Sequence, residues 1–143
     1  MTRVAAAGRP EFKVWRRFTI RWSDNDAYGH VNNTIFYQWF DSAVNGWLVD
    51  QGLLDIQAGD PIALVVETSC SYFVPLEFPQ DVEVGLAVAG LGRSSVRYRV
   101  GVFADGSEAA AAHGEFVHVL VDRRSRRPVE MPGNWRRALE SIS

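Results

Sequence analysis

The sequence predicts one α+β domain over residues 1–143, in which a single long helix packs against a five-stranded antiparallel sheet. Residues 33–50 place apolar side chains at three- and four-residue steps, which is the period of a helix with one buried face. One segment of alternating apolar and polar residues precedes this helix, and four follow it with short turns between them. A chain of 143 residues, 47% of them apolar, suits one core better than two.

The first elements can be placed in order along the chain. Residues 1–10 are small and polar and are predicted to be a loose leader. Residues 12–22 then alternate between apolar and charged side chains, as in a half-buried strand. The helix is predicted to be capped by Asn32 or Asn33, because an asparagine side chain accepts a hydrogen bond from the first helical turn. Gly52 is a suitable end for the helix.

Four further strands are predicted after the helix. They span residues 62–78, 81–90, 95–103 and 108–121. Asp105 and Gly106 form the strongest hairpin signal in the chain. Gly46, inside the helix, is predicted to allow a close crossing with a strand. A short amphipathic segment over residues 135–142 ends the sequence.

Composition and charge exclude several classes of function. A net charge of −2 and a pI near 5.9 argue against a general nucleic-acid-binding protein. No apolar segment approaches the length that spans a membrane, and the first ten residues lack the apolar stretch of a secretory signal, so a cytoplasmic protein is expected. The single cysteine, Cys70, cannot form an internal disulfide, and a buried thiol is favoured over a catalytic nucleophile.

Residues 22–33 contain the groups expected of an active site: carboxylates, an imidazole, a glycine and amides, directly before a helix N-terminus. A calcium loop starting at Asp24 would need a carboxylate where the chain has Ile35, so a calcium loop is excluded. His30 has no second histidine near it in the sequence, and no metal site is predicted.

A purely structural explanation of this stretch is a polar turn that caps the helix, with Asp24 or Asn33 as the cap and His30 as a loop histidine. Aromatic neighbours favour a functional site instead, because a carboxylate beside an apolar surface becomes more basic. These neighbours are Trp22, Tyr28, Phe36 and Tyr37. No serine stands in a G-x-S-x-G setting, so a serine triad is not predicted.

The run R-W-S-D-N-D-A-Y-G-H-V-N-N, followed by an aromatic helix, resembles the hotdog-fold acyl-CoA thioesterases of the 4-hydroxybenzoyl-CoA thioesterase family. The resemblance extends to residues 91–95 (LGRSS) and 116–122 (FVHVLVD) and covers roughly residues 12–132. It implies a hotdog fold, in which the sheet wraps around the long helix. It also implies hydrolysis of an acyl-CoA thioester to a free acid and CoA, with no metal and no cofactor other than the CoA of the substrate itself.

The resemblance implies a role for each residue of the motif. Asp26 would be the catalytic carboxylate, acting either as nucleophile or as general base on water. The backbone N–H of Asn33 would polarise the thioester carbonyl, which agrees with the unpaired N–H groups and positive dipole end of any helix start. His30 would orient water or substrate. Tyr28 and Gly29 would contact the substrate, although plant relatives carry asparagine where this chain has Tyr28.

The resemblance also implies contacts to the rest of the substrate and to other copies of the chain. Arg93, Ser94 and Ser95 stand where relatives contact the CoA nucleotide, and a polar hairpin explains them equally well. The arginines of residues 123–127 are more simply explained as a solvated turn than as a phosphate site. A homodimer or homotetramer is expected, because an exposed sheet edge favours a second subunit and relatives place their sites between protomers.

Two other functions remain open at this stage. A non-catalytic acyl-CoA-binding or regulatory hotdog protein would use the same groove, although Asp26 argues against it. A hotdog hydratase or dehydratase would add or remove water without releasing CoA. The acyl group, and the choice between CoA and acyl-carrier-protein substrates, also stay open, because aromatic residues such as Phe36 and Trp39 fit both an acyl pocket and an ordinary core.

Overall fold

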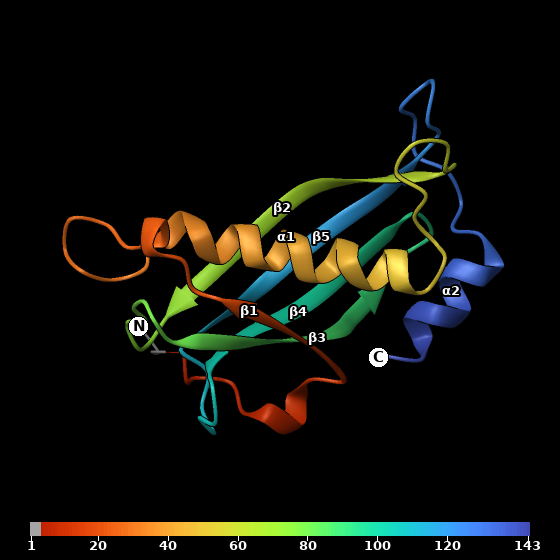
Figure 1. Ribbon diagram of the computed structural model, residues 1–143. Coiled ribbons are helices and arrows are strands. Elements are labelled where there is room, and N and C mark those ends of the chain that lie inside the picture. Colours follow the sequence, from red (N-terminus) through yellow and green to blue (C-terminus); the bar gives the residue numbers. More distant parts are fainter. Residues whose placement is uncertain (1–3) are drawn as a thin grey trace.

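In the computed structural model, which describes residues 4–143, one antiparallel sheet curves around helix α1 (Asn33–Asp50), and this confirms the predicted α+β hotdog architecture (Figure 1). The sheet order β1-β3-β4-β5-β2 places β1 and β2 at the two edges. A short helix, α2 (Gly133–Glu140), follows the last strand. The strands are β1 (Val14–Thr19), β2 (Ile62–Tyr72), β3 (Asp81–Leu91), β4 (Ser95–Ala104) and β5 (Ala112–Val121).

Helix α1 begins and ends where the sequence predicted. Of the two candidate caps, Asn32 is the one used, since its side-chain oxygen accepts a hydrogen bond of 3.0 Å from the Thr34 N–H. At the other end, Gly52 has a positive φ of 72° and donates its N–H to the Val49 carbonyl. The side chains that α1 buries against the sheet are Ile35, Phe36, Trp39, Phe40, Ala43, Val44, Trp47 and Leu48.

The inner face of the sheet completes the core beneath α1. Alternate residues of β3 and β4 are buried there, while most of their neighbours face outward. Two polar side chains, Tyr98 and His118, are also buried among them, and neither Tyr98 Oη nor His118 Nδ1 has a hydrogen-bond partner within residues 4–143. Burial lowers the pKa of His118 to about 4, so its imidazole is neutral near pH 7.

Residues 7–12, which we call the N-terminal strap, pack on the outer face of the sheet and correct the expectation of a loose leader. The Ala7 carbonyl accepts a hydrogen bond of 2.9 Å from the Ala110 N–H. The Phe12 ring lies edge-on to the Phe103 ring, with 5.7 Å between centroids. Burial of these apolar groups, in a small second core, holds the segment in place. The first three residues of the predicted leader lie outside the described part of the chain.

Three predicted strands end differently in the structure. The first, predicted over residues 12–22, forms β1 and then turns at Trp22–Asp24 into a short 3-10 helix. The strand predicted over residues 62–78 ends at Tyr72, in keeping with the prolines that follow, which cannot donate to a sheet. The strand predicted over residues 108–121 starts at Ala112, because the residues before it form a longer connection that pairs with the strap.

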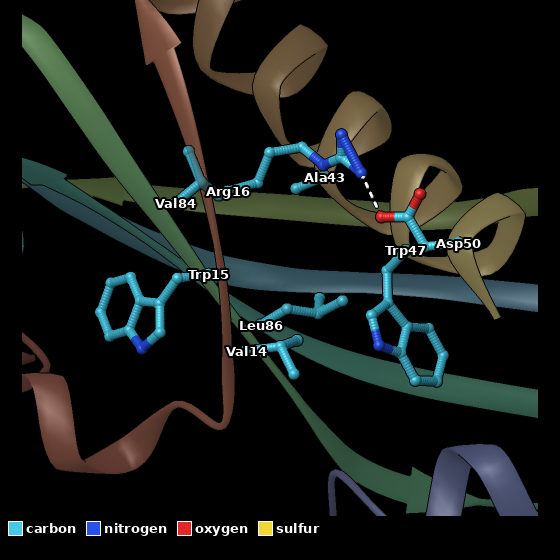
Figure 2. Close-up of a pocket in the computed structure, with 8 residues that line it drawn as sticks. All are labelled: Val14, Trp15, Arg16, Ala43, Trp47, Asp50, Val84 and Leu86. Carbon is cyan, nitrogen blue, oxygen red and sulfur yellow. Dashed lines mark hydrogen bonds and ion pairs between the residues drawn. The ribbon is translucent and has the colours of Figure 1, made fainter.

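A hollow of about 250 Å³ lies between β1 and the C-terminal half of α1 (Figure 2). Figure 2 shows Arg16 reaching from β1 to Asp50 of α1, where the two form an ion pair of 2.6 Å at the rim. Gly46 makes this approach possible, because a Cβ at that position would lie 2.6 Å from Cζ of Arg16. The close crossing predicted for Gly46 is therefore made by an arginine side chain, at the opposite end of α1 from Asn33.

Candidate active site

The loop between η2 (Trp22–Asp24) and α1 is held by its own backbone hydrogen bonds. The Asp26 N–H donates to the His30 carbonyl at 2.9 Å, and the Gly29 N–H donates to the Asp26 carbonyl at 3.0 Å. Gly29 has a positive φ of 83°, a conformation that favours glycine. The loop is thus a tight turn with a defined shape, and a backbone hydrogen bond joins Asp26 to His30 at its base.

Asp24 and Asp26 have different surroundings, and only one of them faces solvent. The Asp24 side chain is 1% exposed and accepts hydrogen bonds from the backbone N–H and the guanidinium of Arg21. The hydrogen bond to Asp24 raises the pKa of the Arg21 guanidinium. The Asp24 carbonyl also accepts the Asn32 N–H at 2.9 Å, so Asp24 fixes the approach to the helix rather than serving a substrate.

Asp26 is half-buried and borders a hollow of about 280 Å³. One carboxylate oxygen, Oδ1, accepts the Tyr28 N–H at 2.9 Å, which orients the group. Trp22 forms the aromatic wall of this hollow and is 78% exposed, with Phe78 edge-on against it at 5.7 Å. The residues that line the hollow are Trp22, Asn25, Asp26 and Gly29.

The start of α1 opens on a second hollow, of about 250 Å³. Asn33 is exposed there, and its backbone N–H makes no hydrogen bond within the described residues, whereas the next two N–H groups bond to Asn32. Such an N–H at a helix start is placed to polarise a carbonyl oxygen. His30 borders the same hollow. The other lining residues are Val31, Phe36, Tyr72, Phe73, Val74, Pro75 and Leu76.

Tyr72, at the end of β2, is a site residue that sequence reasoning missed. Its hydroxyl donates to the Asn33 carbonyl at 3.1 Å and ties the first turn of α1 to the edge strand. The ring stands edge-on to Phe36, with 5.1 Å between centroids. Burial raises the pKa of the Tyr72 hydroxyl, so it remains a neutral donor. Strand alternation places Tyr72 on the helix side, but only the register of β2 shows which residue meets the helix start.

The structure brings the predicted residues together in part. Asp26 and Gly29 lie on the first hollow, and His30 and Asn33 lie on the second, with the loop between them. Tyr28 projects from the loop tip and is 89% exposed, so within one chain it contacts neither hollow. No three side chains of histidine, cysteine, aspartate or glutamate within residues 4–143 are grouped to hold a metal ion.

The predicted nucleotide-binding residues 93–95 lie at the other end of the sheet. They form the turn between β3 and β4, and Ser95 pairs with Val119 near the end of β5. Asn33, in contrast, contacts Tyr72 at the far end of β2. Within one chain these residues therefore cannot reach a substrate whose thioester lies at Asn33. Arg93 itself lies 3.9 Å from Glu130.

Comparison with known proteins agrees with the fold. The sequence profile of the thioesterase-like superfamily matches residues 20–139. The chain is similar to the PA5185 protein of Pseudomonas aeruginosa, with 49% identity, 96% of each chain covered and a TM-score of 0.93. A thioesterase from Thermus thermophilus, solved in complex with coenzyme A and Zn, shows 29% identity over 92% of this chain and 95% of its own, with a TM-score of 0.75.

A more distant structure shares the fold. It is a 1,4-dihydroxy-2-naphthoyl-CoA thioesterase from Synechocystis, with 20% identity over 90% of this chain and 96% of its own, and a TM-score of 0.80. No curated protein matches the chain significantly. Among the described residues, no helix is long and apolar enough to cross a membrane.

Proposed function

Because the chain belongs to the thioesterase-like superfamily, we propose that it hydrolyses acyl-CoA thioesters to a free carboxylic acid and CoA. One observation carries this proposal: a solvent-facing carboxylate, Asp26, and a helix N–H that is unpaired within residues 4–143, that of Asn33, lie at the two ends of one short, hydrogen-bonded loop. A thioester needs a nucleophile or base on one side and a donor to its carbonyl oxygen on the other. A narrower form of the same proposal is that the chain is a member of the 4-hydroxybenzoyl-CoA thioesterase family, which its sequence resembles.

The reaction can follow two routes from this arrangement. As a nucleophile, Asp26 adds to the carbonyl carbon, the C–S bond breaks and CoA leaves as a thiolate. Water then hydrolyses the resulting anhydride, which releases the free acid and the Asp26 carboxylate, and the second proton of that water passes to the CoA sulfur. As a general base, Asp26 takes a proton from water while the oxygen adds to the carbonyl, and that proton passes to the departing sulfur. In both, the Asn33 N–H holds the carbonyl oxygen as negative charge develops. His30 orients the water or the substrate, and Tyr28 and Gly29 contact the substrate.

The same proposal includes pairing of two chains through β2. Residues 64–69 of this edge strand form an unbroken exposed run, in which the Val66 side chain is 60% exposed. A long strand with a free edge and apolar side chains is a template for another strand. Antiparallel pairing of two β2 strands about a two-fold axis would satisfy both edges and close the open side of the hollow beside Tyr72. A homotetramer would be two such dimers.

The proposed reaction requires no cofactor, since water is the second reactant and CoA is part of the substrate. We place it in the cytoplasm, where acyl-CoA is formed and used. The hollow at Asn33 is lined mainly by apolar side chains, so an aromatic or medium-chain acyl group suits it better than a charged one.

The test is thiol release from a panel of aliphatic and aromatic acyl-CoAs, followed with a thiol reagent. Release of CoA from at least one member, with free acid formed in equal amount, is the expected result. Binding of acyl-CoA without release from any member would contradict hydrolysis and favour the binding or regulatory function. Hydration of a 2-enoyl-CoA without CoA release would favour a hydratase.

A further inference from the structure

The hollow between β1 and the C-terminal half of α1 is a preformed space that the proposed hydrolysis does not use. Its volume is about 250 Å³, and an apolar cavity of about 150 Å³ is enough to hold a benzene molecule. Ala43 is the first α1 residue that lines it, so the hollow lies roughly 15 Å or more along the helix from Asn33. It is therefore separate from the two hollows of the candidate active site.

The walls of this hollow are apolar, and its rim is charged. Figure 2 shows the Trp47 ring extending from α1 beside Val14 and Leu86, which belong to the sheet and pack against the main core. In the same view the Arg16 side chain crosses from β1 to α1 and ends beside Asp50. Among the residues that line the hollow, only Arg16 and Asp50 carry a charge. The other lining residues are Trp15, Ala43 and Val84.

Gly46 allows the Arg16 guanidinium to lie against the helix at this rim. A Cβ at Gly46 would lie 2.6 Å from Cζ of Arg16, so any larger residue there would push the guanidinium away. A glycine inside a helix costs about as much stability as one exposed ion pair returns. The fold therefore gains little from holding a cation at the mouth of an apolar hollow, whereas an anion bound there would account for the arrangement.

Asp50 is a weak partner for Arg16. It accepts one hydrogen bond of 2.6 Å, from Nη2, and its side chain is 63% exposed. Pairs this exposed contribute little, because water competes for both groups. A guanidinium has five N–H donors, so Arg16 can also donate to a second acceptor. A carboxylate anchored by an apolar body in the hollow can therefore bind Arg16 beside Asp50 or in its place.

We propose that this hollow is a second binding site, which takes a small carboxylic acid with a compact apolar body, such as an aryl-substituted acetic acid. The apolar body fills the space beside Trp47, Val14 and Leu86, and burial of its surface supplies most of the affinity. The carboxylate reaches Arg16 at the rim, and this contact selects acids over neutral molecules of the same shape. The site does not depend on the proposed hydrolysis, since binding there requires no turnover.

Binding is tested by proton–nitrogen NMR of the tryptophan indole groups, with phenylacetate as the probe. Trp47 reports on this hollow and Trp22 on the hollow beside Asp26, and Trp47→Phe assigns the Trp47 signal. Phenylacetate should shift the Trp47 signal saturably, and phenylacetamide, which has the same shape and no charge, should bind at least about fivefold more weakly. Acetate, which has no apolar body, should give no shift. Equal affinity for acid and amide, or no saturable shift of Trp47 even if Trp22 shifts, would overturn the proposal.

Two variants of the rim should change this affinity in opposite directions. Arg16→Gln removes the cation and should weaken phenylacetate binding at least about fivefold, with phenylacetamide unaffected. Asp50→Asn removes the competing carboxylate and should strengthen phenylacetate binding at least about threefold, and an affinity no higher than wild type would contradict the site. Arg17→Gln is the matched control, because Arg17 pairs with Asp105 and does not line the hollow. Asp26→Asn should bind phenylacetate like wild type, so failure of hydrolysis and failure of this site are distinguishable.

Discussion

The two edges of the sheet are built in opposite ways. Strand β1 has six residues, and its arginines Arg16 and Arg17 form ion pairs with Asp50, Asp81 and Asp105. Strand β2 has eleven residues, makes no ion pair within the described chain, and exposes Val65 and Val66. Charges and a short edge are how proteins protect a sheet from further pairing. The difference supports the proposed pairing of two chains through β2 rather than through β1.

The outer face of the sheet follows the same division. On the β1 side the N-terminal strap covers it, and Phe12 packs with Phe103 and Trp15. The Arg9 guanidinium lies 5.1 Å from the centroid of the Trp15 ring and adds a cation–π contact. On the β2 side, no such segment covers residues 64–69 within the described chain, and they remain exposed. The β2 half of the molecule is also the half that carries Tyr72 and the approach to Asn33.

Among changes at the two sheet edges, the largest effect is expected from charges on β2. The double variant Val65→Lys, Val66→Lys places like charges opposite each other in an antiparallel pair, so the dimer should dissociate. Light scattering should then give the mass of one chain, 16.0 kDa. Thiol release should fall at least about tenfold, because each site loses its second subunit. Thr19→Lys on β1 is the matched control, and an unchanged mass in the β2 variant would show that pairing does not use this edge.

A second effect concerns His118, which pairs with Val65 beneath the β2 edge. Its pKa falls from 6.5 in the unfolded chain to about 4 in the folded protein, so the unfolded state binds more protons between these values. Stability should therefore decrease as pH falls from about 6.5 to about 4, by about 3 kcal/mol in total. The measurement is the free energy of unfolding in denaturant at several pH values. The decrease attributable to His118 is the difference between wild type and His118→Gln, and no difference would contradict a buried neutral imidazole.

A third effect tests the strap on the β1 side. A Cβ added at Gly101 would lie 2.5 Å from Cζ of Phe12 and 3.0 Å from the Phe103 ring, so Gly101→Ala should lift the strap. Overpacking of this kind costs about 1–3 kcal/mol, measurable as a lower midpoint of denaturant unfolding. Gly90→Ala is the control, since no atom lies within 4 Å of its added Cβ. Equal stability of the two variants would mean that the strap moves to accommodate the added methyl group with no loss in the free energy of unfolding.

The smallest effect is expected at the Arg16–Asp50 ion pair of the β1 edge. Gly46→Ala would push the Arg16 guanidinium away from the helix and break the pair. The arginine side chain is 37% exposed and the aspartate 63%, and pairs this exposed contribute about 0–1 kcal/mol. Alanine gains a similar amount over glycine inside a helix. The two changes offset each other, and the free energy of unfolding should stay within about 1 kcal/mol of wild type. A larger loss would mean that this edge depends on a single pair.

Much of the fold follows from local pattern, and the errors occur where distant segments meet. The period of residues 33–50 and the polar cap before them predicted α1 to within one residue at its start, because both signals lie within a few residues of the helix. Two predictions were wrong at their boundaries: that of a loose leader over residues 1–10, and that of a last strand beginning at residue 108. Ala7 and Ala110 stabilise each other across more than one hundred residues, which no local pattern shows.

The sequence predicted which residues the candidate site contains, but not how they are arranged in space. The stretch 22–33 contains two aspartates that look alike in sequence, and the family resemblance selected Asp26. The structure adds a physical difference between the two aspartates. The Asp24 carboxylate forms an ion pair with Arg21, whereas Asp26 lines a hollow. Tyr72 was missed because its contact with Asn33 depends on strand register and helix placement together. The sequence favours a solvated turn for the arginines of residues 123–127, and it does not show that they make no ion pair within residues 4–143.

Turnover by Asp26→Asn is the measurement that tests the proposed chemistry most directly. This change keeps the shape of the side chain and removes its charge, and Asp41→Asn on the exposed face of α1, where Asp41 accepts a hydrogen bond from Asn45, is the matched control. Steady-state thiol release should fall at least about 100-fold for Asp26→Asn at saturating acyl-CoA, with CoA affinity unchanged, and should stay at the wild-type rate for Asp41→Asn. Normal turnover by Asp26→Asn would contradict the assignment and require another group to perform the reaction.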